Sequence, residues 1–266
     1  MNRTDGEFLM SFEDSCDRIP LLWIHGFPLN NLLWDLQIDD LAPLARMITP
    51  DLRGHGATGA SEPPYSMQMF SEDCCNLLDH LGITSPIVVG GLSMGGYIAL
   101  DFQRRYPERT AGLILAATRA GADSDEGKAG RDQAAQLCRD EGVGAIAESM
   151  LPRMLAPGTY QDNRELVEFV RDIMLATSEE GVIGALAAMR DRPDSTPWLE
   201  NIEVPVLVLH GDQDQLIPLK EAENTQVAIP DARLVIVPGA GHLPNLEKPA
   251  YFNEAVSDFL EQFYDH

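Results

Sequence analysis

Short apolar runs alternate with longer stretches of helical periodicity over residues 1–118 and again over residues 198–266. The runs have the length of strands, as in Leu21-Leu22-Trp23-Ile24 and Leu113-Ile114-Leu115-Ala116-Ala117, and glycines, prolines and polar residues bound them. Such an alternation is typical of an α/β fold, in which a mostly parallel sheet is flanked by helices. The pattern predicts strands near 8–12, 21–24, 46–49, 86–90, 113–117, 204–209 and 233–237, and helices over 32–44, 67–81, from 96 onward and over 251–264.

The pattern changes between residues 119 and 197. No strand is indicated there, and helical stretches near 124–141, 145–154, 165–175 and 180–190 are separated by glycines and prolines. A connection of this length carries its own structure, because ordinary loops are much shorter. We therefore expect an α/β core made of residues 1–118 and 198–266, with a helical cap, residues 119–197, inserted into it.

The most specific motif is Gly91-Leu92-Ser93-Met94-Gly95, which lies between an apolar run and a helical pattern. A G-x-S-x-G turn from strand to helix holds its serine in a strained conformation that projects the hydroxyl from the sheet edge. Glycines flank the serine because side chains at those positions would collide with neighbouring elements. The motif predicts Ser93 as a nucleophile.

A serine nucleophile needs a base to remove its proton and a group that orients the base. Asp214 and His242 each follow a predicted strand directly, so they are expected at the same sheet edge as Ser93. Asp212 competes for the acid role, but Asp214 keeps a G-x-x-D-x-x-x-P spacing from Gly211, and we favour it.

The tetrahedral intermediate of such a reaction also requires an oxyanion hole. The backbone N–H groups of Met94, which follows the nucleophile, and of Phe27, in the loop after an early strand, are expected to supply it. His25 and His55 lie in glycine-rich turns near the same edge, where bracing the turn by hydrogen bonds is the expected role.

The cap is rich in methionine, a flexible residue that suits adaptable apolar pockets. Met150, Met154, Met174 and Met189 are candidate substrate-binding residues, and such a lining would suit small uncharged esters.

The charge and composition of the chain limit the kinds of partner that we expect it to bind. The formal net charge of −23 would repel nucleic acid and anionic membranes, so neither is an expected partner. No signal sequence and no run of about 18 apolar residues is seen. The four cysteines, Cys16, Cys74, Cys75 and Cys138, lack metal-binding spacing. We expect reduced thiols, no metal, a cytoplasmic location and a monomer or homodimer.

These motifs together resemble the α/β-hydrolase superfamily over nearly the whole chain. They are His-Gly-Phe-Pro at 25–28, Asp-Leu-Arg-Gly-His-Gly at 51–56, the serine motif, Gly211-x-x-Asp214 and Gly241-His242, in that order. The chain looks most like small bacterial carboxylesterases and 3-oxoadipate enol-lactonase-like hydrolases. The resemblance implies a serine hydrolase without a cofactor. Thr58 stands where relatives usually carry serine, and it keeps a hydroxyl.

The expected function is hydrolysis of short-chain carboxylic esters by a Ser-His-Asp acyl-enzyme mechanism. A lactonase is the nearest alternative. A cofactor-free perhydrolase, a C–C bond hydrolase and a non-catalytic ligand-binding protein of the same fold also remain open. Dehalogenases and epoxide hydrolases of this fold use an aspartate nucleophile, and Ser93 excludes them.

Overall fold

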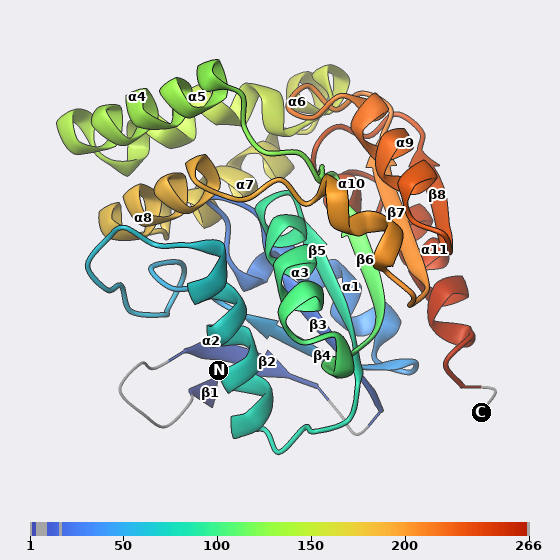
Figure 1. Cartoon of the computed structure of the whole chain (residues 1–266). Coiled ribbons are helices and arrows are strands. Elements are labelled where there is room, and N and C mark those ends of the chain that lie inside the picture. The colour runs from blue at the N-terminus through green and yellow to red at the C-terminus, as the bar shows by residue number, and fades with distance from the viewer. Residues whose placement is uncertain (1, 4–9, 16–17, 265–266) are drawn as a thin grey trace.

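The computed structural model describes residues 2–3, 10–15 and 18–264. One eight-stranded sheet, in the order β1-β2-β4-β3-β5-β6-β7-β8, runs through this part of the chain (Figure 1). The strands are β1 (Asn2–Arg3), β2 (Ser11–Asp14), β3 (Ile19–Ile24), β4 (Ala45–Pro50), β5 (Ile87–Leu92), β6 (Thr110–Ala116), β7 (Val206–Gly211) and β8 (Ala232–Val237).

The sheet is parallel from β4 to β8, and β1 and β2 add an antiparallel edge. The predicted mostly parallel sheet is therefore confirmed. The strand expected near 8–12 corresponds to β2, although residues 8 and 9 lie outside the described residues, as does Cys16. The short strand β1, which precedes it, was not predicted. Because parallel strands end at a common edge, the segments that follow β3, β5, β6, β7 and β8 lie close together.

Helices cover both faces of the sheet. They are α1 (Asp35–Leu41), α2 (Met67–His80), α3 (Met94–Arg105), α9 (Leu219–Ala228), α10 (Pro244–Glu247) and α11 (Pro249–Glu261), with 3-10 turns η1 (Asn31–Trp34), η2 (Pro107–Arg109) and η3 (Thr196–Asn201). The helix expected over 32–44 is thus divided into η1 and the shorter α1, and α9 and α10 were not predicted. The Ser66 hydroxyl caps α2 by accepting a hydrogen bond from the N–H of Met69.

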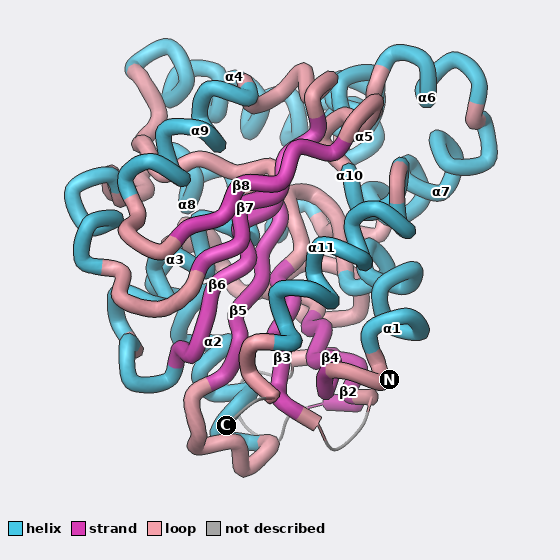
Figure 2. Tube along the Cα trace, turned by 90° about the vertical axis from the view of Figure 1, so that its right-hand side faces the viewer, coloured by secondary structure: helices cyan, strands magenta, loops and turns pink. Residues whose placement is uncertain are grey.

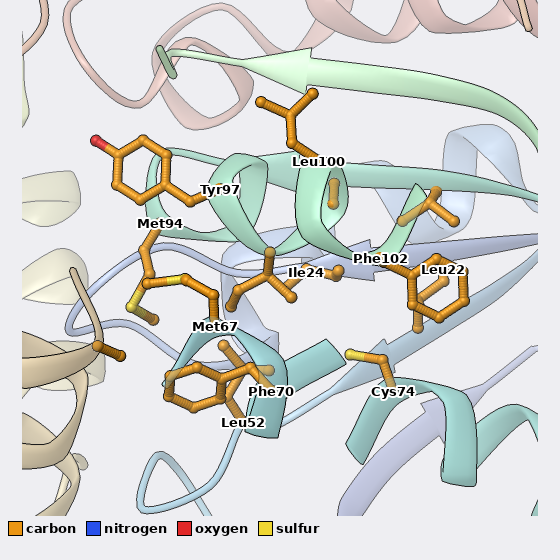
Figure 3. Close-up of a cluster of buried hydrophobic side chains, with 14 of the residues drawn as sticks. Leu22, Ile24, Leu52, Met67, Phe70, Cys74, Met94, Tyr97, Leu100 and Phe102 are labelled. Carbon is orange, nitrogen blue, oxygen red and sulfur yellow. The ribbon is translucent and has the colours of Figure 1, made fainter. Parts of the chain in front are cut away.

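Two hydrophobic cores follow from the alternation of side chains along each strand. In β3, Leu22 and Ile24 point to one face and Leu21 and Trp23 to the other. The first face packs against α2 and α3, as Figure 3 shows for Leu22, Ile24, Phe70 and Phe102. The second packs against α1 and α11, which lie on the opposite side of the sheet in Figure 2.

Between β6 and β7 the chain forms helices and no strand, as the pattern predicts. They are α4 (Asp125–Glu141), α5 (Val143–Met154), α6 (Pro157–Asp162), α7 (Arg164–Leu175) and α8 (Glu179–Arg190), of which α6 was not expected. These helices lie across the carboxyl edge of the sheet (Figure 1). We call α4–α8 the cap.

The cap rests on the core partly through backbone contact. Ser178, at the start of α8, donates from its N–H and its hydroxyl to the carbonyl of Gly54, each at 2.9 Å. A Cβ on Gly181 would lie 2.2 Å from the Gly54 oxygen, so this approach requires glycine.

Candidate active site

Ser93 occupies a sharp turn between β5 and α3. Its backbone has φ 55° and ψ −112°, a conformation that non-glycine residues rarely adopt. A Cβ on Gly91 would lie 2.1 Å from the carbonyl oxygen of Gly95, and one on Gly95 equally close to that of Ile24. Both glycines are therefore required by close backbone packing, and the strand–turn–helix predicted around Ser93 is present.

Two hydrogen bonds hold this turn in place. The N–H of Ser93 donates to the carbonyl of Ala116 at 2.9 Å, and the Thr118 hydroxyl donates to the carbonyl of Ser93 at 2.8 Å. Since Ala116 ends β6 and Thr118 follows it, the adjacent strand supports the serine. The Ser93 side chain stays partly exposed.

Asp214 and His242 form a buried pair. Asp214 follows β7 and His242 follows β8, and His242 Nδ1 lies 2.8 Å from Asp214 Oδ2. The other oxygen, Oδ1, accepts from the N–H groups of Leu216 at 2.8 Å and Ile217 at 3.0 Å. Burial favours the protonated carboxyl, but the interaction with His242 and these hydrogen bonds outweigh it, so the pKa of Asp214 lies below its usual 3.8.

This pairing sets the tautomer of His242. An ionised carboxylate only accepts, so Nδ1 carries the proton and Nε2 keeps its lone pair, as a general base requires. Among the described hydrogen bonds none joins Ser93 Oγ to His242, and catalytic contacts of this kind often tighten only when substrate is bound. Asp212 instead accepts from the N–H of Gly239, at an exposed position.

Two backbone donors lie beside Ser93. The N–H groups of Phe27 and Met94 make no hydrogen bond to any residue in the described part of the chain. A Cβ on Gly26 would lie 3.4 Å from Ser93 Cβ, which shows how closely the Phe27 loop approaches the serine. Free, buried N–H groups at this point have the character of an oxyanion hole.

The two histidines expected to brace turns do so. His25 Nε2 accepts from the N–H of Leu52 at 2.9 Å, and His25 Nδ1 lies 2.9 Å from the Gly26 carbonyl. His55 Nδ1 lies 2.9 Å from the Arg53 carbonyl. Burial lowers the pKa of His55 to about 4 and that of His25 well below 6.5, so both are neutral at pH 7.

The cap is anchored to the loops of the buried pair by residues that the sequence did not single out. Glu247 Oε1 accepts from the N–H of Gly241 at 2.7 Å, and Oε2 accepts from the N–H of Ala156 at 2.8 Å. The Gln215 amide donates to the carbonyl of Leu155 at 3.1 Å. Burial raises the pKa of Glu247, although the Ala156 N–H favours the ionised form. No local sequence signal identifies these contacts, because their partners lie far apart in the chain.

A cavity of about 320 Å³ opens beside the Phe27 loop. Of the four candidate methionines, Met150 lines it, together with Phe27, Leu186 and Leu216. Met154, Met174 and Met189 are almost fully buried in the two hydrophobic cores and do not line this cavity. The structure thus separates one cavity-lining methionine from three packing ones.

Known proteins resemble this chain over nearly its full length. A family described as alpha/beta hydrolase fold matches residues 19–249. A 3-oxoadipate enol-lactonase of Acinetobacter baylyi is 32% identical, over 93% of this chain and 90% of its own. The structure of a thermophilic esterase from Thermogutta terrifontis, with malate bound, matches with a TM-score of 0.95 and 40% identity, covering 98% of this chain and 99% of that one. The structure of the enol-lactonase from Burkholderia xenovorans LB400 matches with a TM-score of 0.89 and 27% identity, covering 96% of this chain and 97% of that one.

The fold and these similarities define a hydrolase whose relatives act as esterases and lactonases. The chain belongs to the α/β-hydrolase family. In the part of the chain that the structure describes, no helix has both the length and the apolar character needed to cross a membrane.

Proposed function

We propose that this protein hydrolyses small carboxylic esters through an acyl-enzyme intermediate on Ser93. The observation that carries the proposal is the combination of a strained serine at the β5–α3 turn with a buried, hydrogen-bonded Asp214–His242 pair. The similarity to an esterase structure at 40% identity over nearly the whole chain supports the same reaction class.

In the first half of the reaction, Ser93 Oγ attacks the carbonyl carbon of the ester and His242 Nε2 takes the hydroxyl proton. The negative charge that develops on the carbonyl oxygen accepts hydrogen bonds from the N–H groups of Phe27 and Met94. The intermediate collapses, the ester C–O bond breaks, and the imidazolium returns the proton to the departing alcohol.

In the second half, water replaces the alcohol and is activated by the same imidazole. The water oxygen attacks the acyl carbon, the bond to Ser93 Oγ breaks, and the proton passes through His242 back to the serine. Asp214 orients the imidazole and stabilises its charged form in both halves. The donors for the oxyanion belong to rigid backbone, so they need no reorganisation during the reaction.

A lactonase is the second candidate, because an enol-lactonase is 32% identical to this chain over 93% of its length. A lactone is a cyclic ester, and its hydrolysis uses the same two halves except that the alcohol stays attached to the acyl group. The two candidates differ in substrate and share the catalytic groups.

The test is a panel of nitrophenyl esters of increasing acyl length beside several lactones, assayed with the parent and with Ser93→Ala. We expect Ser93→Ala to lower kcat by about 10⁴-fold or more while the circular dichroism spectrum is unchanged. Ser257→Ala, on the remote helix α11, is the matched control and should keep parental activity. Activity of Ser93→Ala within tenfold of the parent would refute the assignment. Binding of esters without turnover by the parent would favour the ligand-binding alternative.

A further inference from the structure

The cavity beside the Phe27 loop is bounded by the same loops that carry the proposed catalytic groups. Phe27 borders it on one side, and Leu216, whose N–H donates to Asp214, on another. Arg119 directly follows Thr118, which holds the Ser93 carbonyl. An acyl group attached to Ser93 is therefore close to this cavity.

The polar lining of the cavity is strongly cationic. Arg119, Arg131 and Arg153 line it, against one carboxylate, Asp123. Asp123 is almost fully buried and also pairs with the buried Arg192 at 2.9 Å. Three guanidinium groups, those of Arg119, Arg131 and Arg192, thus share a single carboxylate, in a chain with a formal net charge of −23. The next acid with an electrostatic effect on Arg119 is Glu221, which does not line the cavity.

Several of these guanidinium groups have donors to spare. Arg131 uses Nε to reach Asp123 Oδ2 at 3.1 Å, and its two terminal nitrogens bond to no other residue that the structure describes. Arg119 donates one terminal nitrogen to Asp123 Oδ1, and its buried Nε has no partner. Arg153 is exposed at the rim and forms no ion pair within the described residues. Asp123 is saturated, since it accepts from Arg119, Arg131 and Arg192 together.

Unused, parallel N–H donors of arginine match the geometry of a carboxylate, which accepts two hydrogen bonds side by side. The low polarity of Phe27, Met150, Ile146 and Leu186 around them strengthens such a contact, because less water competes. The cavity volume of about 320 Å³ suits a small ligand.

We propose that this cavity binds a carboxylate carried by the substrate, with Arg131 and Arg153 as specificity-determining residues. The substrate class is esters whose acyl part bears a second, ionised carboxyl group, such as half-esters of short dicarboxylic acids. This assignment rests on the proposed function and replaces the expectation of small uncharged esters, which came from the methionine content of the cap.

The test compares monomethyl glutarate with methyl valerate, which has the same chain but a methyl group in place of the carboxylate. We expect the parent to favour monomethyl glutarate by about tenfold or more in kcat/KM, the range of a charge-assisted hydrogen bond. Arg131→Gln combined with Arg153→Gln should remove this preference mainly through KM, because the carboxylate lies away from the reacting bond. The rate with methyl valerate should stay within about twofold of the parent. Arg164→Gln, at an 89% exposed arginine on α7, is the control and should change neither ester.

The outcomes separate this inference from the proposed function. Equal kcat/KM for the two esters in the parent, or an equal loss for both in the double variant, would overturn the inference while leaving ester hydrolysis intact. If the parent hydrolyses neither ester, the proposed function fails for simple esters, and calorimetry with monomethyl glutarate decides the inference. If the parent binds monomethyl glutarate and the double variant does not, the inference stands. If the parent does not bind it, the inference is overturned.

Discussion

The Glu247 carboxylate bonds to the backbone N–H of Ala156 at 2.8 Å across a separation of 91 residues. Ala156 lies in the cap, and the other oxygen of Glu247 holds Gly241, the residue before His242. One half-buried side chain therefore joins the cap to the residue next to the imidazole. This arrangement connects the cap to the loop that carries the proposed base.

Replacing Glu247 should accordingly affect both stability and turnover. In Glu247→Gln an amide N–H₂ group replaces one of the two oxygens, so the N–H of either Gly241 or Ala156 loses its acceptor. This loss should lower the free energy of unfolding by about 1–3 kcal/mol. We expect a lower melting temperature and a lower kcat, measured by thermal unfolding and by ester hydrolysis. Glu254→Gln, at an exposed position on α11, is the matched control. An unchanged kcat alongside a reduced melting temperature would limit Glu247 to a purely structural role.

The two candidate aspartates should differ sharply. Asp214→Asn removes the charge that orients His242 and stabilises its protonated form, so kcat should fall by about 10⁴-fold. Asp212→Asn changes only the exposed contact to Gly239 and should cost far less. Steady-state kinetics of both variants at one pH measure this ranking, and the reverse order would show that the acid is misassigned.

The methionines of the cap should fall into two groups. Met150→Ala enlarges the cavity and should shift kcat/KM toward longer acyl chains, by a few-fold per carbon, since a buried methylene is worth about 0.8 kcal/mol. Met174→Ala creates a hole in a fully buried position and should lower the free energy of unfolding by about 2–5 kcal/mol without changing the chain-length profile. Parallel chain-length profiles for the parent and Met150→Ala would contradict a role of Met150 in the pocket.

Buried histidines should make stability depend on pH. Burial lowers the pKa of His55 to about 4, whereas the unfolded chain titrates near 6.5. Between these two pKa values the unfolded chain binds a proton at His55 and the folded protein does not. The free energy of unfolding therefore falls as the pH decreases from 6.5 toward 4, by up to about 3 kcal/mol for this group. The free energy of unfolding, measured by urea unfolding at several pH values in this range, should change less with pH for His55→Asn than for the parent. The pH dependence that is left in His55→Asn is expected from His25.

The sequence by itself determined the features that depend on neighbours along the chain. The apolar runs predicted the parallel sheet, because buried strands must be apolar on both faces. The motif around Ser93 predicted its turn, because its glycines lie at fixed spacing on either side of the serine. Gly91 packs against Gly95 within this strand–turn–helix unit, whereas Gly95 packs against Ile24 of β3. The spacing of Asp214 from Gly211 likewise pointed to the aspartate that contacts His242.

Only the tertiary structure decided what depends on residues distant in sequence. Periodicity could not separate Met150 at the cavity from Met174 in the core, because both lie on apolar helix faces and what packs against them belongs to other segments. Nor could net charge reveal the arginines around Asp123, since the charge of −23 is a sum over the whole chain. The electrostatic field in the cavity depends on the distances between charged groups, and these arginines come close together only in the folded chain.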